Sequence, residues 1–524
     1  MPHANQAPRH SASALLLSIA ALLLSLCCPV VPAQAASAGT NYYVDSRTGS
    51  DSNPGTSADR PWQSLAPVEA HHFLPGDVIN LARGSTWTGG LFIDDSGVEG
   101  SPITFQAYGE GAAPILRNPG TWTTAVTIEA NWVVLSGVMV RDAYEYGIRI
   151  AAGADHNTIT GCEVTQVGQG VGVFGQHNLV THCYLHDLVM VVNTPGGSDD
   201  YGAVGVVVMN SYNEISYNRM VRCSAPSYDF GNDGGAVEFY GNVDGCLVHH
   251  NWATENDGFM EIANGSSADN VVAYNVMYNN RRAVVFHTGG SVPSAFRNFR
   301  LENNTIVEVD THPDGSWEWV LLSFWDAAPP PGSIIIRNNI FYMSHVSHVA
   351  NLGGFDHDHN LYYLRDSGAD LGFALGAAEQ IADPLFVNLA AQDFALQPGS
   401  PCVDRAAPAL YGVDFAGHPV PSGAGPDEGA FECTLSVTPA PSAAPSPMPS
   451  ATATPVPTPV PTATPSRAPT LTPTVSISPS KTPTAVVSST GRVRATPTIA
   501  PMRRPGAKAL LRILPLLAWP LQGQ

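Results

Sequence analysis

The middle of the chain repeats one short pattern of polar and apolar positions between Asn131 and Asn360. Each copy starts with a small, polar or apolar residue, continues with alternating β-branched or other apolar residues, and ends with Asn or Cys five positions later. This alternation predicts a short strand with one buried face. The copies occupy residues 157–162, 178–183, 213–218, 246–251, 270–275, 299–304 and 334–339, with weaker copies ending at Ser136 and Asn360.

The ends of these copies are 21 to 35 residues apart, which suits a coil of about 20–30 residues with loops of variable length. One such strand is too small to bury its apolar face alone, so successive copies are expected to stack as parallel strands around a common core. The last residue of each copy should then recur at one corner of every coil. The predicted ladder consists of Cys162, Cys183, Asn218, Asn251, Asn275, Asn304, Asn339 and Asn360.

The repeat resembles that of right-handed parallel β-helix proteins, the fold of pectate lyases, polygalacturonases and phage tailspikes. Residues 42–77 resemble the opening segment of secreted bacterial β-helix enzymes, and residues 383–432 resemble the closing segment of surface-displayed members. The resemblance covers residues 41–433 and implies an all-β fold, a single-stranded right-handed parallel β-helix solenoid. The resemblance does not specify a reaction, because this fold hosts lyases, hydrolases, epimerases and binding proteins.

The two ends of the chain differ from the repeat region. Residues 1–38 contain no acid and carry an apolar stretch followed by small residues, which is typical of a secretory signal peptide. We assign residues 39–433 to the β-helix, 434–501 to a Pro/Thr/Ser-rich disordered spacer, and 502–524 to a basic and apolar tail too short for an ordinary membrane span. We therefore expect a secreted monomer, extracellular or attached to the cell surface, without an integral membrane segment.

Export to an oxidising compartment makes the cysteines disulfide candidates. Cys402 and Cys433 bracket the closing segment and are expected to be bridged. Cys162 and Cys183 occupy ladder positions, where they form either a disulfide or a stack of small apolar thiols. Cys223 and Cys246 are a further candidate pair between neighbouring coils.

The charge of the β-helix region is strongly negative. All 44 acidic residues lie between Asp45 and Glu432, whereas this stretch has only 15 basic residues, all of them arginine. Nucleic acid is therefore not an expected partner, because phosphate contacts need a basic surface. A polyanionic glycan would also be repelled unless Ca²⁺ or a local arginine cluster receives it.

Two glutamates are the leading candidates for catalysis. Glu238 and Glu261 lie 13 and 14 residues before the ladder positions Asn251 and Asn275, so they should be neighbours on adjacent strands, about 5 Å apart. Stacked carboxylates repel, so one should have a raised pKa or both should share a cation. The same face is expected to receive Asp200 and Asp233 from long loops, and Arg282 and His287 from the next coil. The alternative is a solvated acidic face whose Asp-Gly pairs only form turns.

Two mechanisms remain open for these residues. Calcium-dependent β-helix lyases usually use a Lys or Arg base, and residues 39–433 contain no lysine, so elimination would need Arg281, Arg282 or His287. Acid/base hydrolysis needs two carboxyl groups, which the acids supply. The polygalacturonase pattern is incomplete, because Gly-His-Gly and Arg-Ile-Lys do not follow Asp199-Asp200. We predict a hydrolase or lyase that acts on a polysaccharide or cell-surface glycan; the alternative is a non-catalytic glycan-binding or adhesive protein.

Further residues are candidates for binding. Trp317, Trp319 and Trp325 could stack on sugar rings, and Arg281 could contact the substrate. Ca²⁺ is the expected cofactor, because it prefers oxygen ligands. Its candidate ligands are Asp199, Asp229, Asp45 and Asp51.

Overall fold

The computed structural model describes residues 39–197, 199–263, 265, 267–287, 296–309, 320–324, 330–343, 349–350, 355–365 and 371–434. These residues form mostly short strands, together with helix α2 (Ala66–Ala70) and the 3-10 helix η3 (Leu389–Ala391). In this described part, no helix has the length and apolar character needed to cross a membrane.

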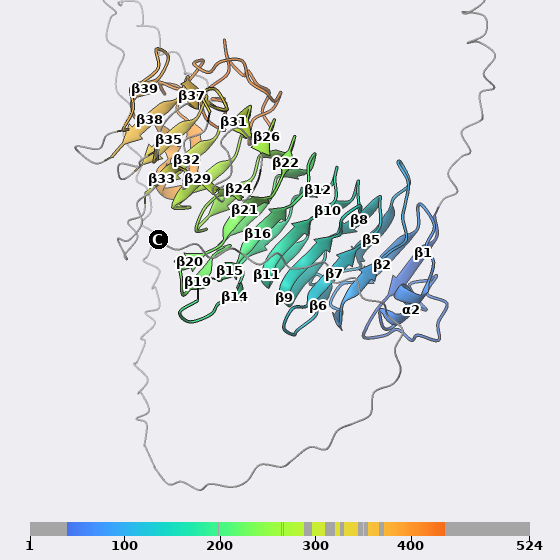
Figure 1. Ribbon diagram of the computed structural model, residues 1–524. Helices are drawn as coiled ribbons and strands as arrows, with labels where there is room; N and C mark the ends of the chain where they lie inside the picture. Colours follow the sequence, from blue (N-terminus) through green and yellow to red (C-terminus); the bar gives the residue numbers. More distant parts are fainter. Residues whose placement is uncertain are drawn as a thin grey trace, which may run out of the picture. The chain divides into compact units, whose positions relative to one another are not determined.

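Parallel strands from successive coils form a first sheet, called sheet 1 here. Its strands follow one another in chain order, and Figure 1 shows them side by side from blue to yellow. They are β1 (Asn41–Val44), β2 (Val78–Ala82), β5 (Ile103–Tyr108), β8 (Val133–Ser136), β10 (Thr158–Thr160), β12 (Leu179–Thr181), β17 (Glu214–Ser216), β23 (Leu247–His249), β27 (Val271–Ala273), β31 (Phe299–Glu302), β34 (Ile334–Arg337) and β37 (Phe355–Asp358).

A second parallel ladder, sheet 2, follows sheet 1 in each coil. Two of its strands are long and bend at the next corner, so that they also belong to sheet 3. Sheet 2 contains β3 (Thr86–Thr88), β6 (Ile115–Arg117), β9 (Met139–Ile150), β11 (Glu163–Val173), β13 (Tyr184–His186), β18 (Arg219–Val221), β24 (Trp252–Thr254), β28 (Val276–Tyr278), β32 (Thr305–Glu308), β35 (Ile340–Met343), β38 (Leu361–Leu364) and β39 (Gln380–Ile381).

The third ladder, sheet 3, completes each coil. It contains the C-terminal halves of β9 and β11 together with β4 (Leu91–Ile93), β7 (Thr124–Ile128), β16 (Val204–Val208), β21 (Gly235–Tyr240), β25 (Met260–Ala263), β29 (Arg282–His287), β33 (Val320–Phe324) and β36 (Val349–Ala350). Smaller pairings lie outside these ladders: β14 (Met190–Val192) with β15 (Tyr201–Gly202), β19 (Ala225–Ser227) with β20 (Gly231–Asp233), β40 (Phe386–Asn388) with β41 (Asp393–Leu396), and the short sheet β22 (Val243–Asp244), β26 (Ser267–Ala268) and β30 (Phe296–Arg297).

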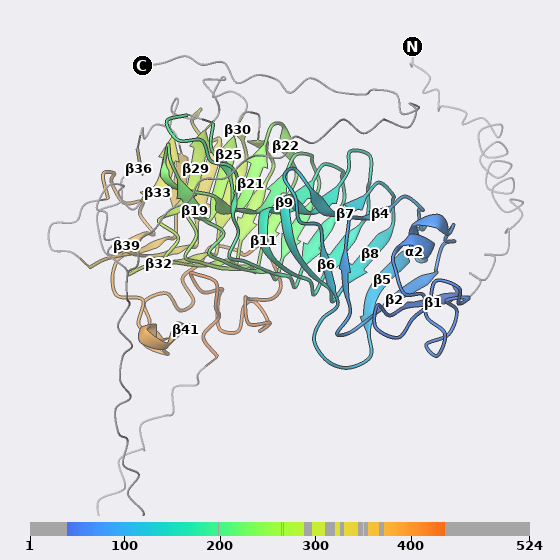
Figure 2. The same cartoon turned by 90° about the horizontal axis from the view of Figure 1, so that it is seen from below.

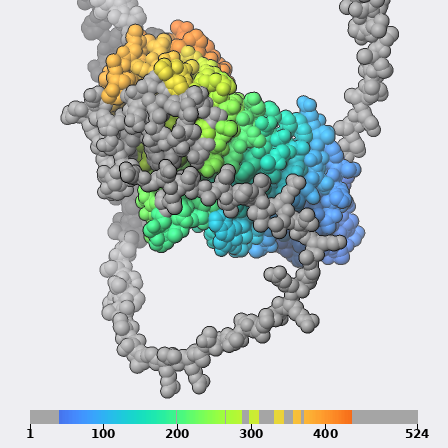
Figure 3. Space-filling view, viewed as in Figure 1, coloured from blue at the N-terminus to red at the C-terminus, as the bar shows by residue number. Residues whose placement is uncertain are grey.

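Rows of aliphatic side chains stack along the interior. In sheet 1 the strand register aligns one buried residue from each coil with its equivalent in the next. Stacking of this kind fills the core at native density and explains why β-branched residues recur in the repeat. The row includes Ile159, Val180, Ile215, Val248, Val272, Leu301 and Ile336. Figure 3 shows the coils in sequence order from blue to orange.

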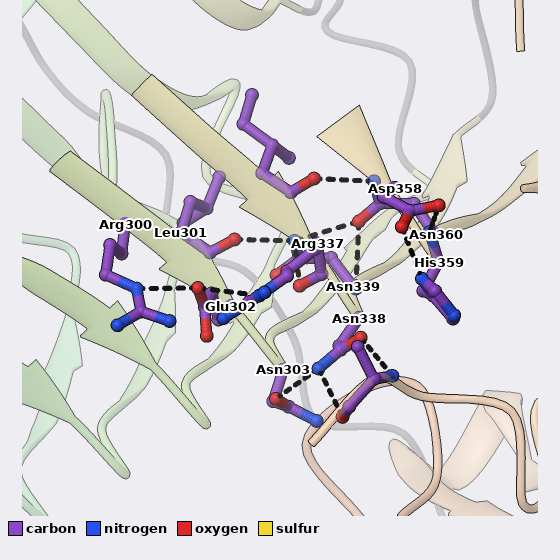
Figure 4. Close-up of polar contacts among 12 residues, drawn as sticks. Arg300, Leu301, Glu302, Asn303, Arg337, Asn338, Asn339, Asp358, His359 and Asn360 are labelled. Atoms are coloured by element: carbon purple, nitrogen blue, oxygen red, sulfur yellow. Dashed lines mark hydrogen bonds and ion pairs between the residues drawn. The ribbon is translucent and has the colours of Figure 1, made fainter. Parts of the chain in front are cut away.

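The predicted corner ladder between sheets 1 and 2 is confirmed. From Cys183 onward, the backbone N–H of each member donates to the side-chain oxygen of the next member at 2.9 to 3.0 Å. Each Asn amide nitrogen also donates to a backbone carbonyl of the preceding coil; Asn339, for example, donates to Leu301 at 2.8 Å (Figure 4). The ladder ends at Glu379, which accepts a hydrogen bond from Asn360 at 2.7 Å. Each amide therefore stabilises two coils.

The other two corners contain shorter ladders of the same kind. Before sheet 1, each backbone N–H of Asn157, Asn178, Asn213 and Cys246 donates to the side chain of the next member, and the series ends at Asn270. Between sheets 2 and 3, Cys223, Asn256, Asn280 and Glu308 continue the pattern. These two ladders were not predicted, although the first of them consists of the residues that begin the sequence copies.

The expected disulfide between Cys402 and Cys433 is wrong, because both residues are thiols. Their sulfur atoms have different surroundings: Cys402 is buried next to Glu428, whereas Cys433 Sγ donates to the Leu396 carbonyl at 3.4 Å. Cys162 and Cys183 are buried ladder thiols, the second of the two alternatives. Cys223 and Cys246 lie at different corners, so they are not bridged to each other.

The closing segment covers the outer face of the later strands of sheet 2. Phe386, Phe394 and Leu396 form a second apolar core with outward residues such as Val276 and Ile340. Figure 2 shows this segment in orange beside β32 and β39. Hydrogen bonds attach it to the coils: Asn338 Nδ2 donates to the Ala407 carbonyl at 3.1 Å. Nearby on sheet 1, the buried Glu302 accepts from Arg300 and Arg337 at 2.7 and 2.9 Å (Figure 4).

Replacing a ladder asparagine should lower stability. Asn304→Ala would leave the buried N–H of Asn275 and the Val272 carbonyl without their partners, at a cost of about 1–3 kcal/mol for an unsatisfied group. Cys183→Ala is the matched control at the same corner, since its thiol makes only long contacts of 3.3 and 3.6 Å. Denaturant unfolding checks this; equal losses of stability in the two variants would contradict it.

Candidate functional site

The centre of the candidate site is a pair of glutamates on sheet 3. Strands β21 and β25 are parallel and place Glu238 directly opposite Glu261. On either side of them in sequence, Val237, Phe239, Met260 and Ile262 are fully buried, so both glutamates project from the outer face of the sheet and are half-buried. The prediction that these two residues are neighbours on adjacent coils is confirmed.

The surroundings of this site raise the pKa values of Glu238 and Asp233. Burial, followed by the charges of Glu261 and Asp233, raises the pKa of Glu238 to about 8. Burial also raises the pKa of Asp233 to about 7, with contributions from Glu261, Asp257 and Asp229, although the Gly234 N–H lowers it. Asp233, at the end of β20, therefore belongs to the same electrostatic group, as predicted. At neutral pH, Glu238 is a protonated acid beside another carboxyl group.

Asp200, expected among the catalytic acids, has a structural position instead. It is buried and accepts hydrogen bonds from the N–H groups of Thr194 and Tyr228 at 2.7 and 2.6 Å and from Ser227 Oγ at 3.1 Å. Burial alone would raise its pKa, but these hydrogen bonds outweigh it and lower the pKa. Asp200 therefore joins the loop of hairpin β14–β15 to that of hairpin β19–β20, and we remove it from the candidate acids.

The arginine pair also differs from expectation. Arg281, predicted to contact substrate, is buried, and its Nη1 donates to Asp257 Oδ1 at 2.5 Å. Arg282 Nη1 donates to the other oxygen of Asp257 at 3.2 Å. Both guanidinium groups thus bind one buried carboxylate beneath the site. The expectation that Arg281 binds substrate is wrong because its side chain is not accessible.

The remaining predicted residues are only partly covered by the structure. His287 lies in β29, opposite Ala263 of β25, but its side chain is outside the described part. Trp317, Trp319 and Trp325 lie outside the described residues altogether.

The four predicted calcium ligands do not converge. Asp45 and Asp51 lie in the opening segment, where Asp45 accepts from Arg47, Thr48 and Ser85 and Asp51 accepts from Gln63 and Ser64. Their oxygens thus already bind protein donors. Asp199 and Asp229 lie in the two hairpin loops near sheet 3. Among the described residues, no group of three or more His, Cys, Asp or Glu is arranged to hold a metal.

Calcium binding by the hairpin carboxylates Asp199 and Asp229 stays a prediction. If Ca²⁺ bridges them, binding to the folded state raises stability by mass action. Adding EDTA should then lower the melting temperature, and excess Ca²⁺ should restore it. A melting temperature that responds to neither addition would count against a bound ion.

Comparison with known proteins agrees with this geometry. Residues 124–312 match the family described as the right-handed beta helix region. The chain is a right-handed parallel β-helix protein. A 90-residue stretch is 41% identical to the lacto-N-biosidase of Bifidobacterium longum subsp. longum, and the match covers 16% of this chain but only 6% of that relative.

The solved structure of a pectate lyase shares the fold of this β-helix at low sequence identity. The crystal structure of pectate lyase Pel9A superposes with a TM-score of 0.50 at 17% identity, covering 76% of this chain and 97% of that chain. The GH136 lacto-N-biosidase from Eubacterium ramulus gives a TM-score of 0.41 at 16% identity, covering 62% of this chain and 68% of that chain. At such identities, the likeness shows the fold alone.

Sequence reasoning missed a set of aromatic residues on the β-helix before the glutamates. Trp122 precedes β7, Tyr146 lies in β9, and Tyr201 lies in β15. The rings of Trp122 and Tyr201 are 6.4 Å apart. A single aromatic residue in a loop carries little signal in one sequence, and these three are separated by 24 and 55 positions. Only the stacking of coils brings them together.

Proposed function

We propose that this β-helix protein is a glycoside hydrolase that cleaves a glycan with Glu238 and Glu261 as its catalytic residues. The observation that carries the proposal is their direct pairing on the outer face of sheet 3, with the pKa of Glu238 raised to about 8 by burial and by Glu261 and Asp233. A carboxyl group with a raised pKa beside a second carboxyl group is the arrangement that glycoside hydrolysis needs.

In the proposed reaction, Glu238 donates its proton to the glycosidic oxygen as the bond to the anomeric carbon breaks. Side chains of paired residues on parallel strands are separated by about one strand spacing, about 4.8 Å. This is closer to the about 5–5.5 Å of retaining enzymes than to the about 6.5–9.5 Å of inverting ones. Glu261 would then attack the anomeric carbon, and water activated by Glu238 would hydrolyse the resulting ester. Asp233 helps to keep Glu238 protonated.

Elimination has less support. No lysine lies within residues 39–433, and Arg281 and Arg282 both bind Asp257. Both guanidinium groups are therefore already hydrogen-bonded to a buried carboxylate, which leaves them poorly placed to act as a base toward a substrate. The 90-residue similarity to a lacto-N-biosidase also favours glycosidic cleavage.

Activity on a polysaccharide panel tests the proposal. New reducing ends without ultraviolet-absorbing unsaturated products are expected, because hydrolysis adds water across the bond. Ultraviolet-absorbing ends would identify a lyase, and binding without any product would identify a glycan-binding or adhesive protein. We further propose secretion to the extracellular space or cell surface, on the basis of residues 1–38 and the spacer.

A further inference from the structure

A row of register-aligned positions on sheet 3 runs from Arg149 to the glutamates, with Gly172 and Val207 buried between them. The strand register aligns Arg149, Gly172, Val207, Glu238 and Glu261 in consecutive strands. Arg149 is therefore three strand spacings before Glu238, about 14 Å. A short oligosaccharide that lies along the stacked coils could span this distance.

Gly172 makes room for an aromatic ring in this row. A Cβ atom at position 172 would lie 2.6 Å from the Tyr146 ring and 3.1 Å from that of Phe174. Arg149 lies over the Phe174 ring at 4.8 Å. The pKa of Tyr146 is raised by burial and then by Glu145, Tyr201 and, to a smaller extent, Glu238. Tyr146 therefore covers the row at Gly172, and its strand partner Thr124 follows Trp122 by two positions.

Trp122 and Tyr201 expose large ring surfaces to one side of this row, five positions before Thr127 of β7 and six positions before Val207 of β16. Their exposed fractions are 55% and 39%, and their rings are 6.4 Å apart at an angle of 40°. Two large aromatic faces exposed side by side form a contiguous apolar patch, the kind of surface that marks ligand-binding sites. Flat, amphipathic rings suit the C–H faces of sugar rings.

Both rings are held in place by polar contacts of their loops. Next to Trp122, Thr123 Oγ1 lies 2.8 Å from the Gly120 carbonyl, and Asn118 Nδ2 donates to the Thr124 carbonyl at 2.9 Å. Next to Tyr201, the buried Asp200 accepts three hydrogen bonds of 3.1 Å or less. Fixed rings lose little conformational entropy on binding, which favours affinity.

We infer that Trp122 and Tyr201, together with Tyr146 and Arg149, form a binding subsite for an uncharged oligosaccharide on the face that carries the glutamates. The inference rests on the proposed function, because it gives the substrate class of the same site. The choice of an uncharged ligand follows from charge. Near the rings, Arg149 is accompanied by Glu145, and the β-helix as a whole carries 44 acidic residues against 15 arginines between Asp45 and Glu432. A uronate chain would be repelled there.

Isothermal titration of the full chain carrying Glu238→Gln, which prevents turnover, tests the subsite. The probes are hexasaccharides of cellulose, mannan, xylan and chitin, with hexagalacturonate and hexamannuronate as charged counterparts. We expect at least one uncharged probe to bind and both uronates to fail. In this background, Trp122→Ala and Tyr201→Ala should each weaken binding by about tenfold or more, as expected for an aromatic hot spot.

Tyr217→Ala is the matched control, because Tyr217 is 40% exposed but follows sheet 1 at another corner. It should leave the affinity unchanged. The inference is overturned if no uncharged probe binds, if a uronate binds more tightly, or if Trp122→Ala and Tyr201→Ala bind as well as their parent. These outcomes concern affinity alone. The proposed hydrolysis is tested separately, by measuring product formation by the chain with Glu238 intact, so the two failures can be told apart.

Discussion

Glu238→Gln should lower the turnover of the proposed hydrolase by about 10²–10⁴-fold, the usual contribution of a general acid. Glutamine keeps the size of the side chain but cannot donate the proton that the leaving oxygen needs. Measured initial rates of reducing-end release would check this. Exposed Glu99→Gln is the matched control and should keep the parent rate. Full activity of Glu238→Gln on a substrate that the parent cleaves would place the catalytic acid elsewhere.

The same residue predicts a pH dependence with a definite sign. Because the pKa of Glu238 is raised to about 8, the acid is present below this pH, and the rate should fall as the pH rises through it. The folded state favours the protonated carboxyl. The stability of the folded state relative to the unfolded chain therefore declines as the pH rises from the ordinary glutamate pKa of 4.5 to about 8. Glutamine does not ionise, so at pH 9 the variant should melt no lower than the parent.

Asp257→Ala should destabilise the fold by about 3–5 kcal/mol, because removal of one partner leaves buried charge without compensation. The side chains of Asp257 and Arg281 are only 6% and 5% exposed, and that of Arg282 is 15% exposed. Denaturant unfolding would measure the change. Loss of Asp257 should also release the arginines beneath the glutamate pair, so activity should fall even at temperatures where the variant stays folded.

A surface ion pair in the same region provides the control. Arg297 and Asp269 are joined at 3.1 Å, but their side chains are 68% and 50% exposed. Solvent-exposed pairs contribute little, so Asp269→Ala should leave the unfolding midpoint nearly unchanged. Equal sensitivity to Asp257→Ala and Asp269→Ala would contradict the role assigned to the buried arginine pair.

The coil architecture could be predicted from the sequence because the same pattern of an alternating strand and a corner residue recurs several times. The period-2 apolar pattern specifies the buried row, and the recurring asparagine specifies the corner. The ladder from Cys183 to Asn360 and the pairing of Glu238 with Glu261 follow from counting between these positions. The corner with Cys223, Asn256 and Asn280 lies five residues after the ladder positions Asn218, Asn251 and Asn275. The same counting would therefore have found it.

The roles of Asp200, Arg281 and the Cys402–Cys433 pair could not be predicted for a different reason. Asp200 and Cys402 depend on partners in irregular segments, Ser227 and Glu428. Arg281 instead binds Asp257, which lies 24 residues earlier at the same corner of the preceding coil. Burial of a polar side chain in such loops leaves no periodic trace in the sequence. Trp122 and Tyr201 were missed for the same reason, since only the stacking of coils brings their loops together.

The hydrogen bonds of the corner ladders are asymmetric along the axis of the solenoid. From Asn218 to Asn360 at the corner between sheets 1 and 2, the later coil supplies the side-chain amide, and the earlier coil supplies the backbone N–H and carbonyl. Asn251, for example, binds Asn218 and Ile215 in this way. A coil that loses its successor would therefore present unpaired main-chain groups, while a coil that loses its predecessor would present a mobile side chain that water can solvate. The two ends of the stack are thus unequal, and Glu379 closes the end that would otherwise remain open to further chains.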